Sequence, residues 1–254
     1  DIPEGGRAAK GRAIVNLIGC EPDEKVSAFI SVKEFNDDHY VVMATEKGMV
    51  KKTKLSAYSN PRKKGIYAVE IRDGDKLIEA RVSTGDNDIL LGTRNGKSIR
   101  FSEEQIRASG RKTMGVKGIT LSSEDDRLVG MLLIKREGTV LVATEKGFGK
   151  RTEISQYRAQ KRGGKGVLTM KTTDKVGKMV TIKEVVDKDD LMIITNQGVL
   201  IRLPVAQIRS IGRATQGVKL IKLGEGTLVS SITRIMSEEE EDENNNTEST
   251  DPKE

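Results

Sequence analysis

Short apolar runs alternate with polar, glycine-bearing turns along this chain, and one such arrangement returns four times. An apolar run leads into a turn that ends in glycine at residues 41–48, 89–96, 140–147 and 191–198. The turn glycines are spaced by 48, 51 and 51 residues. Apolar, β-branched runs on either side of Asn-Gly, Lys-Gly or Gln-Gly predict β-hairpins, because the turn needs a residue that tolerates positive φ.

Two further anchors keep the same period. Glycines at 65, 115, 166 and 217 are spaced by 50, 51 and 51 residues, and each precedes an apolar alternating run. A third strand precedes each hairpin, and its apolar anchors at 26, 77, 128, 179 and 228 are spaced by 51, 51, 51 and 49 residues. Three anchors with one period predict a repeat of about 50 residues with roughly four short strands, the size of a propeller-type blade. One blade cannot bury both of its faces, so we expect an all-β, propeller-like fold in which blades stack around an axis.

The repeat and the composition divide the chain in two. We predict a β domain over residues 1–236, with units at 24–73, 74–124, 125–175 and 176–225 and half-units at 1–23 and 226–236. Residues 237–254 hold nine acidic residues and one Lys, which predicts a disordered acidic tail. The chain starts at Asp1 without an initiator Met, so we expect a fragment of a longer protein.

The formal net charge of +6 hides a strongly basic body. Without the acidic tail there are 43 basic and 29 acidic residues, a net charge of +14, which indicates a polyanionic partner. The basic residues fall between the hairpin turn and the second glycine anchor of each unit, so blades around an axis would carry a positive stripe on their rim. The predicted DNA contacts in this stripe are Arg62, Lys63, Lys64, Arg111, Lys112, Lys117, Lys150, Arg151, Arg158, Arg213 and Lys219.

The densest basic site is Gln160-Lys161-Arg162-Gly163-Gly164-Lys165-Gly166. Adjacent glycines let backbone N–H groups approach a phosphate, while the flanking cations neutralise its charge. A repeated positive stripe suits a bent duplex, since displaced counterions drive binding and each contact offsets part of the bending energy. Aromatic residues make up only 3 %, which disfavours single-strand binding by base stacking, and no recognition helix is visible. We therefore expect contacts to the DNA backbone and shape.

This heptapeptide resembles the gyrase A box, Q-R-R-G-G-K-G, with Lys161 in place of an Arg. Together with the repeat, the Gly-Arg-x3-Gly motifs at 110–115 and 212–217 and the acidic tail, it resembles the C-terminal DNA-wrapping domain of DNA gyrase A, of the type IIA topoisomerases. The resemblance runs from about residue 6 to residue 236. It implies a β-pinwheel whose blades exchange strands and whose rim wraps double-stranded DNA, in support of ATP-dependent negative supercoiling by the holoenzyme.

The same resemblance implies the cellular setting. The expected partners are double-stranded DNA, the rest of a homodimeric gyrase A protein, and the gyrase B protein in an A2B2 holoenzyme in the bacterial cytoplasm, at the nucleoid. ATP and Mg would be used by other domains, so we expect no cofactor and no membrane partner for this chain. The family usually has six blades with the box on the first. Four hairpins are present here and the box lies in the third complete unit, which leaves open whether it is the primary box or a secondary copy.

Several classes of activity are excluded or disfavoured by the residues themselves. His39 is the only histidine and Cys20 the only cysteine, so His-based triads, His-rich metal sites and internal disulfides are excluded, and we expect no catalysis by this chain alone. No apolar run approaches the roughly 18 residues of a membrane span, and no signal peptide is visible. Two alternatives stay open: the corresponding C-terminal domain of topoisomerase IV, and a propeller scaffold that binds acidic proteins. Residues 238–243 would either compete with DNA for the rim or merely solubilise the end of the chain.

Overall fold

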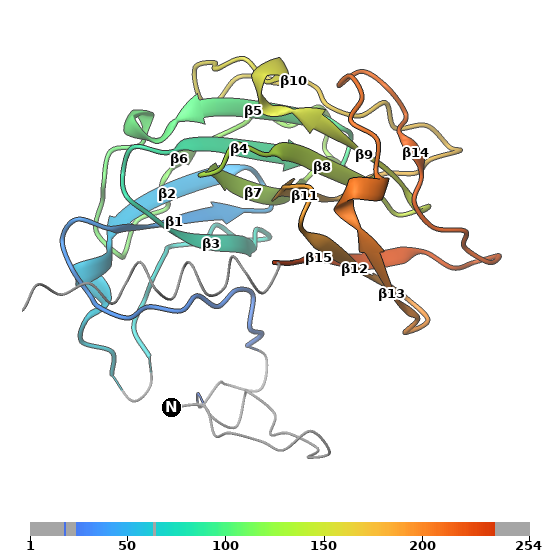
Figure 1. Ribbon diagram of the computed structural model, residues 1–254. Helices are drawn as coiled ribbons and strands as arrows, with labels where there is room; N and C mark the ends of the chain where they lie inside the picture. The colour runs from blue at the N-terminus through green and yellow to red at the C-terminus, as the bar shows by residue number, and fades with distance from the viewer. Residues whose placement is uncertain (1–17, 19–23, 63–64, 237–254) are drawn as a thin grey trace, which may run out of the picture.

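The computed structural model describes residue 18, residues 24–62 and residues 65–236. Within these residues, fifteen strands form four antiparallel sheets arranged as the blades of a propeller (Figure 1). The all-β, propeller-like prediction is confirmed. Each hairpin is followed by a short 3₁₀ helix, and these are η1 (Leu55–Tyr58), η2 (Glu103–Gln105), η3 (Ile154–Gln156) and η4 (Val205–Gln207).

All four predicted hairpins are present, one in each sheet. They are β1 (Tyr40–Thr45) with β2 (Met49–Lys54), β4 (Asp88–Thr93) with β5 (Lys97–Ser102), β8 (Thr139–Thr144) with β9 (Phe148–Glu153), and β12 (Asp190–Thr195) with β13 (Leu200–Pro204). Their turn glycines have φ values of 77° to 83°, the positive range that the turn chemistry predicted. The glycine period therefore marks the hairpin turns.

The strands that flank each hairpin come from later in the chain. On one side lie β3 (Leu77–Ser83), β7 (Leu128–Ile134), β11 (Met179–Val185) and β15 (Val229–Ile235). On the other side lie β6 (Val116–Lys117), β10 (Val167–Leu168) and β14 (Val218–Lys219). The sheet orders are β3-β1-β2-β6, β7-β4-β5-β10, β11-β8-β9-β14 and β15-β12-β13.

This topology changes the interpretation of the repeat. The apolar strand that precedes a hairpin in the sequence pairs with the hairpin before it, as β3 pairs with β1 rather than with β4. A predicted unit is therefore a period of sequence and does not correspond to a blade. Each blade takes its hairpin from one unit and its flanking strands from the next, which is the strand exchange that the resemblance implied.

The same rule explains where predicted strands did not form. The segments anchored at Val26 and Gly65 would pair with a hairpin one unit earlier, and the described part of the chain has no hairpin before β1. In these two segments the side chains of Phe29 and Tyr67 are exposed. Strand β13 has no fourth-strand neighbour among the described residues. Of the two predicted half-units, 226–236 supplies β15. Half-unit 1–23, apart from residue 18, and the predicted tail 237–254 lie outside the described residues.

The flanking strands define an inner and an outer edge for each blade. Strand β7 contacts both β3 and β11, and β11 contacts β15, so these four are the inner strands around the axis. They border a cavity of about 770 Å³, lined by Arg81, Leu132, Lys183 and Arg234 among others. Strands β6, β10 and β14 form the opposite, outer edges, and in Figure 1 β6 lies at the left, β10 at the top and β14 at the right.

The core lies between neighbouring blades because successive residues of a strand face opposite sides of a sheet. In β4, Leu91 packs with Val42 of the first blade, whereas its neighbour Leu90 packs with Val142 of the third. Leu141 of the third blade packs in turn with Leu191 of the fourth. Both faces of the middle blades are therefore apolar, as the near-continuous apolar runs of the hairpins require.

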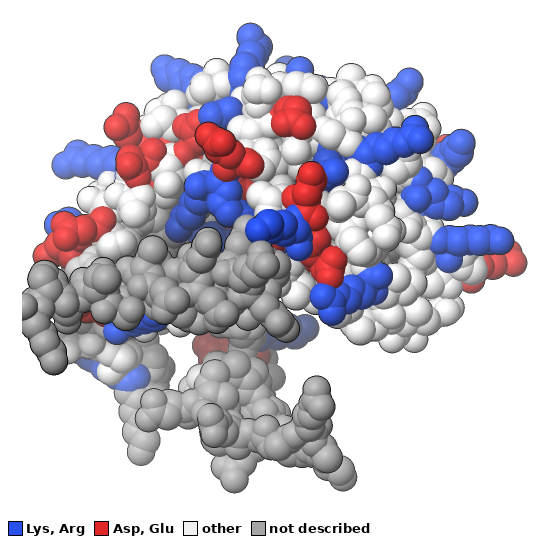
Figure 2. All heavy atoms as spheres, in the orientation of Figure 1, with Lys and Arg blue, Asp and Glu red and all other residues white. Residues whose placement is uncertain are grey.

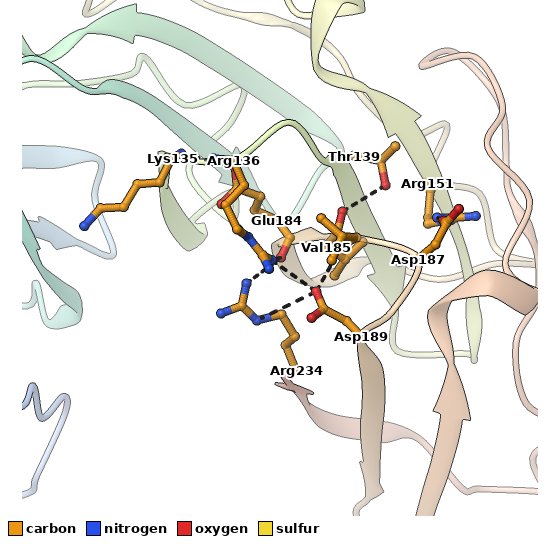
Figure 3. A network of polar contacts seen from close by, with 10 residues as sticks. Lys135, Arg136, Thr139, Arg151, Glu184, Val185, Asp187, Asp189 and Arg234 are labelled. Atoms are coloured by element: carbon orange, nitrogen blue, oxygen red, sulfur yellow. Dashed lines mark hydrogen bonds and ion pairs between the residues drawn. The ribbon is translucent and has the colours of Figure 1, made fainter. Parts of the chain in front are cut away.

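A polar network also joins the third and fourth blades near the axis (Figure 3). The fully buried carboxylate of Asp189 accepts hydrogen bonds from Arg136 Nη2 at 3.1 Å and from the Val186 amide at 3.0 Å, and Arg234 Nε lies 4.0 Å away. Arg136 also pairs with Glu184 of β11 at 3.7 Å. One buried carboxylate thus links the β7–β8 turn to β15.

Candidate nucleic-acid interface

Three loops that end in glycine lead into the outer strands. We call them the rim loops: residues 110–115 before β6, residues 160–166 before β10, and residues 212–217 before β14. Since these strands are the outermost of their blades, the loops lie on the outer edge of three successive blades. Figure 2 shows Lys and Arg side chains projecting at intervals along the upper and right outline of the molecule, the side of Figure 1 that carries β5, β10 and β14.

Rim loop 160–166 is docked onto the preceding unit by its backbone. The Gly163 amide donates to the Gly118 carbonyl at 2.6 Å, and the Thr120 amide donates to the Gly164 carbonyl at 2.9 Å. The Thr120 hydroxyl also donates to the Gly163 carbonyl at 2.7 Å. At the end of the loop, Gly166 has a φ of +67° as the chain enters β10. The loop is therefore a fixed part of the blade edge.

The three cations of this loop have different roles. Arg162 is half-buried and donates from Nε to the Gln105 carbonyl at 2.9 Å and from Nη1 to the Lys117 carbonyl at 3.2 Å. Lys161 and Lys165 are exposed, and neither makes an ion pair or hydrogen bond within the part of the chain that is described. Arg162 consequently holds the loop, and the two lysines are available to an anionic partner.

The other two rim loops are held by buried lysines. Lys51 of β2 donates from Nζ to the Arg111 carbonyl at 2.7 Å and to the Ala68 carbonyl at 2.6 Å. Lys150 of β9 donates to the carbonyls of Gly212 and Arg213. Burial, together with a smaller effect from the positive charge of Arg111 or Arg213, lowers the pKa of each lysine to about 8. Each ammonium group replaces water as the donor to loop carbonyls.

Two of the predicted DNA contacts are therefore wrong. Lys150 is 0 % exposed, and its ammonium is occupied by the loop carbonyls. Arg151 is also buried, donates from Nε to the Ile208 carbonyl at 2.7 Å, and pairs with Asp187. The sequence does not distinguish Lys150 and Arg151 from surface cations. Both faces of β9 are covered, so the alternation of residues along this strand does not indicate which side chains are exposed.

Most other predicted contacts lie at the surface. Arg111 and Arg213 are half-buried, and the Arg213 Nη1 donates to the Leu168 carbonyl at 2.8 Å. Two exposed lysines lie over aromatic rings, Lys112 at 5.3 Å from the Tyr67 centroid and Lys219 at 5.6 Å from that of Phe148. The exposed cations of the predicted set are Arg62, Lys112, Lys117, Arg158, Lys161, Lys165 and Lys219. Lys63 and Lys64 lie outside the described residues.

Charge patterning missed two residues that hold the box-like loop. Gln105, in η2, contacts Gln160 and Arg162, and Thr120 contacts Gly163 and Gly164. Neither carries a charge, so neither stood out in a search for basic patches. Glutamine recurs 51 residues apart at 105, 156 and 207, but this recurrence does not indicate which of the three contacts a rim loop.

Comparison with known proteins identifies the family. A family model described as "DNA gyrase C-terminal domain, beta-propeller" matches residues 1–33, 39–84, 87–135, 138–185 and 189–235. The DNA gyrase A protein of Staphylococcus epidermidis (strain ATCC 12228 / FDA PCI 1200) is 45 % identical over 242 residues, which are 94 % of this chain and 27 % of that protein. The DNA gyrase A protein of Staphylococcus aureus (strain NCTC 8325 / PS 47) is 43 % identical over 253 residues, 98 % of this chain and 28 % of that protein. The chain thus spans just over a quarter of the length of these relatives.

Solved structures of similar fold include domains of two topoisomerases. The C-terminal domain of DNA topoisomerase IV superposes with a TM-score of 0.86 at 25 % identity, covering 94 % of this chain and 76 % of that one. A DNA gyrase A C-terminal domain superposes with a TM-score of 0.80 at 23 % identity, covering 90 % and 76 % of the two chains, and supports the fold. No helix in the described residues is long and apolar enough to cross a membrane. Five matched repeats and the strand-exchanged blades together place this chain in the DNA gyrase C-terminal domain family.

Proposed function

We propose that this chain binds and bends double-stranded DNA along its rim loops, and wraps it as the C-terminal domain of a DNA gyrase A protein. The observation that carries the proposal is the recurrence of exposed cations beside glycine loops on the outer edge of three successive blades. A duplex that follows this edge would meet Lys112 and Lys117, then Lys161 and Lys165, then Lys219. Contacts repeated along one edge favour bent DNA, because each helps to offset the elastic energy of bending.

Membership of the family supports a wider role. Wrapping would support ATP-dependent negative supercoiling by a holoenzyme of gyrase A and gyrase B proteins, with ATP and Mg used by other domains. In this proposal the chain itself is not catalytic, binds no cofactor, and works in the bacterial cytoplasm at the nucleoid. The C-terminal domain of topoisomerase IV is a second candidate, favoured by its structural similarity at a TM-score of 0.86. The closer sequence relatives and the intact Gly163–Gly166 portion of the box favour the gyrase assignment.

Binding measured over a range of salt concentrations tests the first part of the proposal. Each neutralised phosphate contributes about −0.9 to the slope of log affinity against log salt concentration, so contacts from several rim cations give a steep slope. A slope near zero would contradict DNA binding and favour a protein-interaction scaffold.

A topology assay tests wrapping. Nicked circular DNA is ligated with the chain bound, and the linking difference that remains after protein removal is measured. We expect a linking difference that grows with the amount of bound chain and disappears at high salt. Duplex binding without any trapped linking difference would contradict wrapping.

A further inference from the structure

The box-like rim loop is held by a neutral side chain from the preceding unit. The Gln105 side-chain amide donates from Nε2 to the Gln160 carbonyl at 3.2 Å, and its Oε1 accepts from the Arg162 amide at 2.9 Å. A single side chain thus pairs with the backbone on both sides of Lys161. The Gln105 carbonyl accepts a third bond, from Arg162 Nε at 2.9 Å.

These bonds leave Lys161 exposed between two fixed neighbours. Gln160 and Arg162 are half-buried, whereas Lys161 is exposed and makes no hydrogen bond or ion pair among the described residues. A backbone fixed on both sides limits the directions in which the lysine side chain can leave the loop. Less conformational freedom is then lost when its ammonium group binds a phosphate.

This arrangement is specific to one blade. The positions three residues after the first three hairpin glycines hold Lys51, Ile99 and Lys150. Lys51 and Lys150 anchor rim loops 110–115 and 212–217 through their ammonium groups, whereas the apolar Ile99 can supply no donor to loop 160–166. In this blade Gln105 supplies the side-chain amide contacts on either side of Lys161, while Thr120 contacts the loop further along, at Gly163 and Gly164.

The next blade offers a natural comparison. Gln156 occupies the same place in η3 as Gln105 does in η2. It is exposed, and its side chain makes no hydrogen bond within the described part of the chain. A glutamine at this place is therefore not by itself a clamp, and the bonds of Gln105 are not a general feature of the 3₁₀ helix.

We propose that Gln105 is a positioning residue for DNA binding: it holds loop 160–166 so that Lys161 faces the phosphate backbone. The inference rests on the proposed DNA-binding function. Its distinctive consequence is that removal of a neutral amide has the same effect on DNA binding as removal of a positive charge.

The experiment compares Gln105→Met, which keeps the length of the side chain but removes its amide, with Gln156→Met as the matched control. Lys161→Ala and the double variant Gln105→Met/Lys161→Ala complete the cycle. Affinity for a short duplex is measured by fluorescence anisotropy from low to high salt with the 254-residue chain. We expect Gln105→Met to weaken binding about tenfold, or about 1.4 kcal/mol, and to reduce the salt slope by about 0.9. Lys161→Ala should do the same, the double variant should lose no more than either, and Gln156→Met should match the wild type.

Failure of this inference can be distinguished from failure of the proposed function. A wild-type chain whose binding does not depend on salt would refute the function itself. If the wild type and Lys161→Ala behave as expected but Gln105→Met keeps wild-type affinity and slope, the positioning role is refuted.

Hydrogen exchange followed by mass spectrometry separates positioning from folding. For Gln105→Met we expect faster exchange only in peptides that cover residues 158–166, with thermal unfolding close to that of Gln156→Met. Faster exchange in all four blades, with a lower unfolding temperature than the control, would make Gln105 a general determinant of stability and overturn the proposal.

Discussion

Two glycines of the box-like loop should respond in opposite ways to the same substitution. Gly166 has a φ of +67°, and a Cβ added there would lie 2.3 Å from the Ser98 carbonyl oxygen. Gly164 does not have a positive φ, and its added Cβ would meet only Ile99 Cδ1 and the Lys161 carbonyl oxygen, each at the ordinary contact distance of 3.5 Å. The fold therefore requires glycine at 166 and does not require it at 164.

The magnitudes follow from these contacts. In Gly166→Ala, a left-handed alanine costs about 1–2 kcal/mol, and relief of the clash requires β10 to move away from β5, where Val167 pairs with Ser98. We expect a total loss of about 3 kcal/mol in the free energy of unfolding. In Gly164→Ala, the reduced freedom of the unfolded chain adds about 0.4–1 kcal/mol of stability. This second variant should thus be as stable as the wild type or slightly more so.

The effect on DNA binding should differ from the effect on stability. Gly164 is exposed and its conformation does not need glycine, so under the proposed function we expect the DNA backbone to approach closely at this position. A methyl group there should weaken duplex binding by roughly tenfold, or about 1.4 kcal/mol, without loss of stability. Urea unfolding and fluorescence anisotropy measure the two quantities. Wild-type affinity in Gly164→Ala would refute the close approach, and wild-type stability in Gly166→Ala would refute the loop geometry.

Three further outcomes test other parts of the structure. Asp189→Asn removes the buried carboxylate shared by Arg136 and Arg234, whose side chains are 24 % and 27 % exposed. It should lower the free energy of unfolding, measured in urea, by about 2–3 kcal/mol, and a loss below about 0.5 kcal/mol would contradict the role of Asp189 in linking the two blades. Lys150 loses its proton near pH 8 when folded but near pH 10.5 when unfolded, so wild-type stability relative to Lys150→Met should rise between these pH values in urea unfolding; a flat difference would argue against the lowered pKa. Deletion of residues 237–254 should tighten DNA binding most at low salt in anisotropy titrations if the acidic residues compete for the rim, and unchanged affinity would exclude competition.

The fold could be predicted from sequence to the extent that it depends on local chemistry. The turn glycines require positive φ, and apolar runs beside them form hairpins, so all four hairpins could be placed by their period. The pairing of flanking strands could not be placed in this way. Leu77 and Leu128 each lie between two hairpins in the sequence, and only packing around the axis determines that they join the earlier one. A local sequence pattern therefore does not predict with which hairpin a flanking strand pairs.

The same distinction between local patterns and long-range contacts applies to the residues of the candidate site. Exposed cations such as Lys161 and Lys165 were found from charge clustering, because surface cations near glycines carry a local signal. Lys150 was misassigned because its burial depends on a loop about 60 residues later, whose carbonyls its ammonium group satisfies. Gln105 was missed for the converse reason, since a neutral residue gains its role only from a partner 55 or 57 residues away. Long-range contacts decided both cases.

Strand exchange accounts for why these long-range contacts meet at the rim. Each rim loop leads into an outer strand that pairs with the hairpin of the preceding unit, as Val167 pairs with Ser98 and Val218 pairs with Gly149. Whatever holds a loop must therefore come from one unit earlier, and Lys51, Gln105 and Lys150 all do so. The position of each exposed cation is then fixed by two units at once. Because the loop and its anchor belong to successive units, a substitution in the anchor of one unit should change the position of the exposed cations of the next.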